Sequence, residues 1–311
     1  AAGSCVITAT KAQDANYSAV SVTYTVAVAF ADQASVSVTN ATTVVYGSTL
    51  ALTASGGTGT GAYQFDTVSG PCSISGTTLS TTAAGNCVLH ARKQGDSGFN
   101  ASAWSANVTV SITPKPLSLA VVVDPSSREY NTSRTVALAA TSASNLTGMI
   151  NNDAVGTDDS KLSAIVSTAD VATNKVVTVT VASGFLTGAN AGNYQLPTVT
   201  GTPVLTITRT AQASISVTSA LTTVFGQNIS LSATGGSGTG ALTFATTSGP
   251  CTVAASIMTP TSAGSCVVVA TRAGDTNYFA QTQSATVAIA AATQATVALT
   301  SATTVVYGST L

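Results

Sequence analysis

The decapeptide Ala41–Leu50, ATTVVYGSTL, occurs twice in this chain, because Ala302–Leu311 repeats it without a change. The match is longer than the decapeptide: residues 1–50 lie on residues 262–311 without a gap, with 31 identities in 50 pairs. Self-similarity at a fixed spacing is typical of arrays of small modules that act as spacers, adhesive stalks or filaments. We therefore expect a segment of a tandem array, and we do not expect an enzyme.

A second spacing defines the repeating unit. Residues 33–112 lie on residues 212–291 at an offset of 179, and a third copy begins at Gln294, 82 residues after Gln212. The stretch between the first two copies does not align with them. The sequence therefore predicts five parts, in this order: the C-terminal part of a repeat (1–32), a full repeat (33–113), a different module (114–210), a full repeat (211–292) and the N-terminal part of a further repeat (293–311).

Composition limits the classes of partner. Only 7% of the residues are charged and the net charge is −1, so nothing predicts binding to nucleic acid or to an anionic membrane. The mean hydropathy is +0.38. The longest apolar runs, at 26–31 and 287–292, are nevertheless far shorter than the roughly 18 residues that cross a bilayer. We expect no membrane insertion in this segment, and no cofactor.

Apolar and polar residues alternate with period two, as in Asn107–Ile112 (NVTVSI) and Val176–Val181 (VVTVTV). Such alternation predicts half-buried strands, and the β-branched residues Val and Thr favour strands over helices. The glycine-rich segments 56–61 and 235–240 predict hairpin turns with positive φ angles. In the first full repeat the pattern predicts strands near 34–39, 48–54, 62–68, 77–82, 86–92 and 103–112. Short strands at this spacing predict antiparallel β-sandwiches.

The modules follow one another almost without linkers, since Val110–Thr113 runs directly into Pro114–Leu117. The two prolines fix φ and stiffen that junction. We expect each module to bury its own core, and the module at 114–210 to share almost no core contacts with its neighbours. The chain is thus predicted to form an extended, semi-rigid rod of sandwiches.

The cysteines follow the repeat. Cys72 and Cys87 are 15 residues apart, and so are Cys251 and Cys266. This recurrence predicts two disulfides and hence an oxidising compartment, although buried cysteines without a bond are the alternative. Cys5 aligns with Cys266, so its partner is expected outside the chain, upstream of residue 1. No metal site is expected, because the chain has one histidine and no Cys-x-x-Cys pair.

Three further features suit either a ligand or the fold alone. The turn Asp14–Tyr17 (DANY) recurs as Asp96–Phe99 (DSGF) and Asp275–Tyr278 (DTNY). Its ring is expected to close the end of the sandwich, with carbohydrate stacking as the alternative. The acidic segment 151–159 (NNDAVGTDD) suits turns or a calcium site, but it lacks the twelve-residue calcium loop pattern. His90 has no evident nucleophile and acid beside it, which favours an ordinary position on a strand.

Residues 42–100 resemble the Ig-like repeats of large bacterial surface proteins, with a Tyr-Gly strand, a Gly-Gly-x-Gly turn and two spaced cysteines. The segment 114–210 resembles the YDG, or MBG, repeat of filamentous-haemagglutinin-like adhesins. It begins with Pro114–Leu117 (PKPL), has Tyr130–Thr132 (YNT) where that family has Tyr-Asp-Gly, and ends with Gly188–Leu196 (GANAGNYQL). These resemblances imply a secreted or surface-displayed array with a spacer or adhesive role and without catalytic residues.

The predicted fold is therefore all-β: a tandem array of antiparallel Ig-like β-sandwich domains. The expected function is that of a structural repeat segment in a long extracellular fibre or adhesin stalk on a bacterial cell surface. Copies of the chain along or beside the fibre are the expected partners, because strands with few charges lack the residues that keep sheet edges from pairing. The alternative is an adhesin module that binds a glycan or a host protein through loops of 114–210. Its aromatic candidates, Tyr130, Phe185 and Tyr194, are expected to lie mostly in the core.

Overall fold

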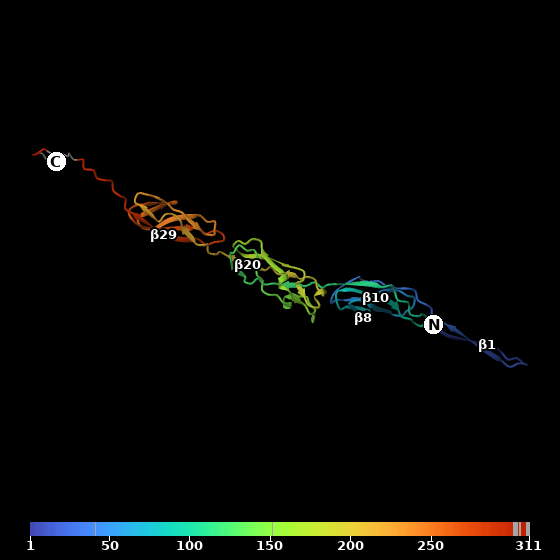
Figure 1. The fold of residues 1–311 in the computed structure, drawn as a ribbon. Coiled ribbons are helices and arrows are strands. Elements are labelled where there is room, and N and C mark those ends of the chain that lie inside the picture. The colour runs from blue at the N-terminus through green and yellow to red at the C-terminus, as the bar shows by residue number, and fades with distance from the viewer. Residues whose placement is uncertain (41, 151, 301–303, 305, 309–311) are drawn as a thin grey trace. The chain divides into compact units, whose positions relative to one another are not determined.

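A computed structural model describes residues 1–40, 42–150, 152–300, 304 and 306–308. The described residues form strands, turns and three single-turn 3₁₀ helices, η1 (Ala143–Asn145), η2 (Asp159–Lys161) and η3 (Ala191–Asn193), and no α-helix (Figure 1). The all-β prediction is confirmed. Most of the second copy of the decapeptide, at 302–311, lies outside the described residues. Within them, no helix has the length and apolar character needed to span a membrane.

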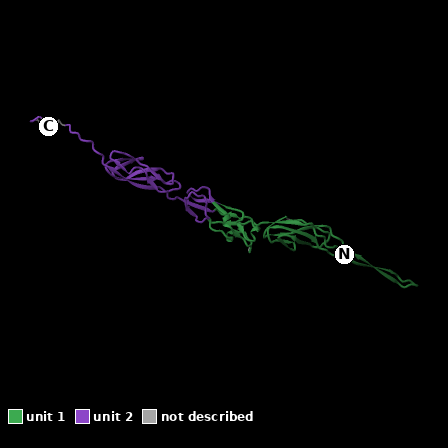
Figure 2. Cartoon of the chain, viewed as in Figure 1, with its two compact units in different colours: residues 1–122, 138–164, 179–202 green, residues 123–137, 165–178, 203–311 purple. Residues whose placement is uncertain are grey.

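The chain divides into two compact units, which Figure 2 colours separately. Unit 1 comprises Ala1–Val122, Leu138–Ala164 and Val179–Thr202, and unit 2 comprises Val123–Ala137, Ile165–Thr178 and Pro203–Leu311. Residues 33–113, the first Ig-like repeat, belong to unit 1, and residues 211–292, the second Ig-like repeat, belong to unit 2. Residues 114–210, the central module, contribute to both. The five boundaries inferred from the sequence remain a prediction.

The first Ig-like repeat is built from three sheets, with strand orders β4-β11-β10-β7, β5-β9-β8 and β3-β6. Alternate side chains of these strands are buried, as the period-two pattern predicts. Its strands are β3 (Val36–Val38), β4 (Thr43–Val45), β5 (Thr49–Ala51), β6 (Ala54–Gly56), β7 (Tyr63–Ser69), β8 (Cys72–Ser75), β9 (Thr78–Thr81), β10 (Gly85–Lys93) and β11 (Val108–Thr113).

The second Ig-like repeat has the same topology, with sheets β22-β29-β28-β25, β23-β27-β26 and β21-β24. Each strand therefore has a counterpart in the first Ig-like repeat. Its strands are β21 (Ile215–Val217), β22 (Thr222–Val224), β23 (Ile229–Ser230), β24 (Ala233–Gly235), β25 (Leu242–Ser248), β26 (Cys251–Ala254), β27 (Ile257–Pro260), β28 (Gly264–Arg272) and β29 (Gln281–Ala290).

The last strands of the two repeats differ in register. The first residue of β28 pairs with Ile289, whereas the first residue of β10 pairs with Ile112. Ile112 therefore corresponds to Ile289 and not to Ala291, so the gap-free alignment is wrong over this strand by two residues. The cause is segment 101–107, which lies outside the strand ladder: two of its serine hydroxyls accept hydrogen bonds from β10 amides.

The glycine-rich segments are not hairpin turns. Residues 56–61 connect β6 to β7, and these strands belong to different sheets. Gly56 and Gly57 have the predicted positive φ angles. Gly61 allows the backbone to pass close to that of Gln94, because a Cβ at residue 61 would lie 2.0 Å from the carbonyl oxygen of Gln94. The segment thus crosses between sheets and packs against the turn that follows β10.

The N-terminal hairpin, β1 (Gly3–Lys11) and β2 (Val20–Val28), is the counterpart of β28 and β29. All its residues are exposed, while side chains of β28 from Cys266 onward alternate between buried and half-buried. The difference arises because Cys266 and Val268 of β28 pack in a core cluster with Ile229, Leu231 and Met258. No residue of β1 or β2 is among the buried core residues that the structure describes.

The central module contributes short strands to both units. In unit 1 it forms the sheets β14-β12-β19 and β15-β18, and in unit 2 strand β20 pairs in parallel with β13 and antiparallel with β17. Its strands are β12 (Ser118–Ala120), β13 (Ser127–Glu129), β14 (Leu146–Thr147), β15 (Gly156–Thr157), β16 (Leu162–Val166), β17 (Ala172–Val181), β18 (Leu186–Thr187), β19 (Thr198–Thr200) and β20 (Val204–Thr208).

The buried core of unit 1 runs without a break from the first Ig-like repeat into the central module. It includes Leu79 and Leu89 of the repeat together with Leu119, Phe185 and Tyr194 of the module. The expectation that the central module shares almost no core contacts with its neighbours is therefore wrong on this side. Burial of apolar area across the boundary stabilises both parts.

Candidate functional site: the joints between modules

Each complete Ig-like repeat is cross-linked by a disulfide between its two main sheets. Cys72 on β8 is bonded to Cys87 on β10, and Cys251 on β26 to Cys266 on β28, each pair with a Cα–Cα distance of 5.9 Å. These are the pairs that the 15-residue spacing predicts. Cys5 is a free, exposed cysteine. The cross-links stabilise the sandwiches and offer no chemistry beyond that.

The residues that enter successive modules are held in the same way. Each makes an isolated parallel bridge to the aromatic residue of the turn before the end of that module. The three pairs are Ala31 with Phe99, Lys115 with Tyr194, and Thr210 with Tyr278. We call the turns Asp96–Phe99, Asn190–Tyr194 and Asp275–Tyr278 the aromatic turns. Each joint thus consists of an aromatic turn and the chain that crosses it.

An aspartate fixes the aromatic turn of each Ig-like repeat. Asp96 accepts hydrogen bonds from the amides of Gly98 at 2.9 Å and Phe99 at 3.0 Å, and from the amide of Thr60 at 2.5 Å. Asp275 accepts the equivalent bonds in the second repeat. These donors, the Thr60 amide first, lower the pKa of Asp96 to about 2. The Thr239 amide likewise lowers the pKa of Asp275.

A glutamine locks the incoming chain onto the aromatic turn. The Nε2 of Gln212 donates to the carbonyl oxygens of Ala273 at 3.0 Å and Phe279 at 2.8 Å, and its Oε1 accepts from the amide of Gly238 at 3.1 Å. Gln33 makes the equivalent bonds in the first repeat. Because the side chain of Gln212 is buried, its polar atoms have lost their contact with water, and each of these bonds supplies the partner that they would otherwise lack.

In unit 1, the joint between the first Ig-like repeat and the central module is a buried polar cluster. Tyr46 and Tyr194, which are 5% and 6% exposed, meet edge to face with ring centroids 5.7 Å apart. Both phenols donate to the carboxylate of Asp153, and Tyr194 also accepts from the amide of Ile150 at 2.9 Å. Burial raises the pKa of Tyr194 to about 12, and the bond to Asp153 adds to the rise. The phenols therefore remain neutral donors over the physiological pH range.

Backbone groups complete this joint. The Oδ1 of the buried Asn193 accepts from the amide of Ala84 at 2.9 Å, and its carbonyl oxygen accepts from the amide of Lys115 at 2.9 Å. Gly47 is required beside Tyr46, because its φ is +81° and a Cβ there would lie 2.2 Å from Ile150. The Tyr-Gly pair of the decapeptide thus serves contact with the next module.

In unit 2, the joint between the central module and the second Ig-like repeat uses the same elements. The ring of Tyr278 meets that of Tyr130 edge to face at 5.3 Å. Asn277 accepts from the amide of Val171 at 2.9 Å and donates to the carboxylate of Asp170 at 3.0 Å. A tyrosine of one module again meets the tyrosine of the following aromatic turn.

The other residues considered as candidate sites, His90 and the acidic segment, make contacts within the fold. His90 stacks on Trp104 with ring centroids 4.0 Å apart, and Arg92 lies over the same indole. In the acidic segment, Asp158 accepts from the Ser160 amide and Asp159 from Thr141, while Asn151 lies outside the described residues. Over the part of the chain that the structure describes, no three His, Cys, Asp or Glu residues gather as a metal site.

The aromatic turns were visible in the sequence, but their role was misjudged. Phe99 and Tyr278 are half-buried at the joints and lie outside the buried cores that we expected them to close. The glutamines were missed altogether. Their recurrence as Gln33, Gln212 and Gln294 was the available signal.

The central module has a family match. Residues 113–201 match the model of the YDG domain. This confirms the resemblance to the YDG domain for that stretch, and the match covers less than half of the chain. No curated protein matches the chain.

Solved structures with partial likeness include Drosophila N-cadherin EC1-4, at 10% identity and a TM-score of 0.31, covering 93% of this chain and 83% of that one. Sidekick-1 immunoglobulin domains 1-5 match at 14% identity and a TM-score of 0.33, covering 91% of this chain and 65% of that one. At these TM-scores, neither likeness supports a conclusion about this chain.

The aromatic turns should make the chain acid-sensitive. The pKa of Asp96 is lowered to about 2 in the folded protein from an ordinary value of 3.8. The Asp96 carboxylate therefore stabilises the fold fully at a pH above this ordinary pKa, and this stabilisation is lost as the pH falls toward 2. In Asp96→Asn, the free energy of unfolding should therefore fall less between pH 4 and pH 2 than it does in the unaltered chain. Urea unfolding at each pH measures this. Asp66→Asn, on the exposed side of β7, is the control. An unchanged acid limb in Asp96→Asn would contradict this role.

Proposed function

We propose that this chain is a structural segment of an extracellular array, in which successive modules are held by ordered joints and together act as a spacer or stalk. The observation that carries the proposal is the recurrence of one joint three times, at Phe99, Tyr194 and Tyr278. A flexible tether would need no such pairing, since Gly- and Ser-rich linkers are enough to connect domains.

Two features support a location outside the cell. The disulfides Cys72–Cys87 and Cys251–Cys266 persist in oxidising compartments and are rare in the cytosol. The YDG match and the resemblance to adhesin repeats support a bacterial cell surface.

Copies of the same chain are the partners that we propose for this segment. With 7% charged residues and a net charge of −1, neighbouring chains repel one another only weakly. The strands also have few of the lysines and glutamates that protect sheet edges. Association along or beside a fibre would therefore depend little on salt.

The alternative function, binding of a glycan or a protein, would need exposed aromatic rings, and the three candidate rings are not free to contact a ligand. Phe185 is fully buried, Tyr194 is 6% exposed and contacts Tyr46, and Tyr130 contacts Tyr278. These rings serve the core and the joints, so no observation favours a second function.

A flexible insertion tests the spacer function. Six Gly and Ser residues placed between Thr113 and Pro114 should release the joint, because such linkers behave as random coils. Small-angle X-ray scattering of the unaltered chain should be fitted by one conformation, and that of the insertion variant should require a broad ensemble. The same insertion after Gly76, which faces open space in the β8–β9 turn, is the control. Equal scattering from all three proteins, or tight binding to an arrayed glycan, would argue against the spacer.

A further inference from the structure

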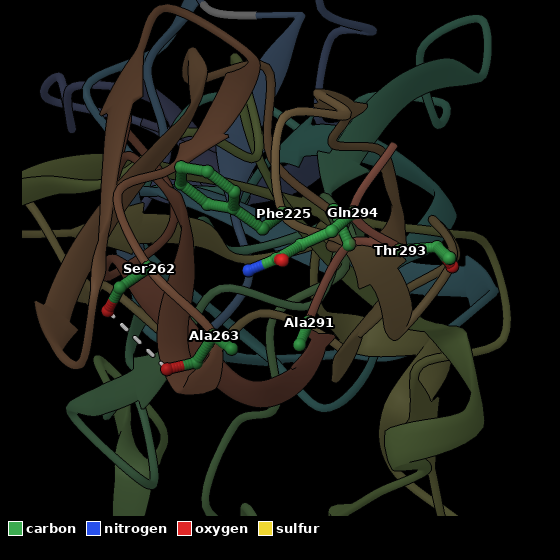
Figure 3. A pocket seen from close by; sticks show the side chains of 7 residues that line it. Phe225, Ser262, Ala263, Ala291, Thr293 and Gln294 are labelled. Atoms are coloured by element: carbon green, nitrogen blue, oxygen red, sulfur yellow. Dashed lines mark hydrogen bonds between the residues drawn. The ribbon is translucent and has the colours of Figure 1, made fainter. Parts of the chain in front are cut away.

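The second Ig-like repeat has an open cavity of about 490 Å³ at its end, beside the chain that leaves β29. Figure 3 shows Phe225 on one side and the extended chain Ala291–Gln294 on the other. The cavity is lined by Phe225, Ser262, Ala263, Ala291, Ala292, Thr293 and Gln294. Its walls are mainly apolar, and the side chain of Phe225 is 45% exposed.

The same surface is covered in the first Ig-like repeat. Phe225 corresponds to Tyr46, which is 5% exposed beneath Tyr194 of the following module. Gly226 has no atom within 4 Å of an added Cβ, whereas a Cβ at its counterpart Gly47 would strike the next module. The cavity therefore lies on a surface of the second Ig-like repeat whose counterpart in the first Ig-like repeat is covered by the next module.

The N-terminal fragment shows what this surface binds. Ala263 and Ala292 correspond to Ala2 and Ala31, since residues 1–50 align with 262–311. The amide of Ala2 donates to the carbonyl oxygen of Ser97 at 2.9 Å, and that of Ala31 to Gly98 at 3.0 Å. Both acceptors belong to the aromatic turn of the first Ig-like repeat. Two backbone donors at these positions thus recognise two carbonyl groups of one turn.

We propose that this cavity is the docking site for the aromatic turn of an Ig-like repeat of the 33–113 type, which continues from residues 293–311. The amides of Ala263 and Ala292 donate to two carbonyl oxygens of the turn, and its aromatic ring lies against Phe225, as Tyr194 lies against Tyr46. Gln294 then locks the incoming chain, as Gln33 does in the first repeat. This inference rests on the proposed spacer function and adds the joint between two adjacent Ig-like repeats.

The two amides have no acceptor among the described residues, which makes them suitable reporters. The test is an extended chain with a copy of residues 51–113 added after Leu311. The product is in register, because Ala302–Leu311 is identical to Ala41–Leu50. Single-residue hydrogen exchange should show that Ala263 and Ala292 exchange freely in the unaltered chain and are slowed about tenfold or more in the extended one.

The matched variant replaces the aspartate of the added turn, the copy of Asp96, with alanine. Protection of both reporters should then be lost while the added repeat keeps a protected core. Because the added repeat alone could fail to fold, an extension by residues 51–210 is measured alongside, which also supplies the central module and its shared core. Free exchange at both reporters beside a folded added repeat would overturn the proposal.

Three further outcomes separate the possible failures. If Ala84 and Lys115 are protected while the reporters are not, this inference fails and the proposed function stands. Free exchange at all four amides would contradict both this inference and the proposed function. Protection of Ala263 in the unaltered chain that rises with protein concentration would show that a second molecule occupies the cavity, and would overturn the assignment.

Discussion

Replacing Cys72 and Cys87 together with alanine is expected to lower the free energy of unfolding of the first Ig-like repeat by about 3 kcal/mol. The disulfide closes a loop with a sequence separation of 15 and joins two sheets across a small core. Without it, the unfolded chain gains entropy that the folded state does not. Alanine is chosen because Cys87 is fully buried and a serine hydroxyl would be left without a partner there.

Chemical unfolding followed by the fluorescence of Trp104 measures this effect, because Trp104 is the sole tryptophan and lies in that repeat. Cys5→Ala is the control, since Cys5 is exposed and free, and it should leave the midpoint unchanged. An unchanged midpoint in the double variant, or free thiols at these positions in the native protein, would contradict the prediction.

Replacing Tyr194 with alanine should cost about 3 to 5 kcal/mol, the usual range for removing a large buried aromatic side chain. The ring packs on Tyr46, and its hydroxyl bonds to Asp153 and Ile150. Because these contacts connect the first Ig-like repeat to the central module, their loss should also uncouple the two. Unfolding followed by Trp104 fluorescence and by circular dichroism should then give two transitions in place of one shared transition.

The hydroxyl and the ring can be separated. Tyr194→Phe keeps the ring but leaves Asp153 and the Ile150 amide without this partner, for an expected cost of about 1 to 3 kcal/mol. Tyr17→Ala is the matched control, because Tyr17 occupies the same motif position but is 75% exposed, and it should change stability by less than about 0.5 kcal/mol. Coincident transitions in Tyr194→Ala would show that the cluster does not couple the modules.

The strands and cross-links follow from local signals. Alternation with period two located most strands of the first Ig-like repeat, because each strand faces a core on one side and water on the other. It did not reveal β4, β6 or β8 as separate strands. The cysteine pairs were accessible because the same spacing occurs twice. The gap-free alignment failed at β11, where serine hydroxyls replace strand pairing and change the register by two residues.

The sequence by itself determined the all-β class and the two cysteine pairs, since each depends on residues close together in the chain or on a repeat. Only the tertiary structure decided the joints. Tyr46 and Asp153 are 107 residues apart, and Ala84 and Asn193 are 109 apart. No local pattern couples such positions. Whether a ring lies in a module's core or on the next module depends on which surfaces meet once each sandwich has formed.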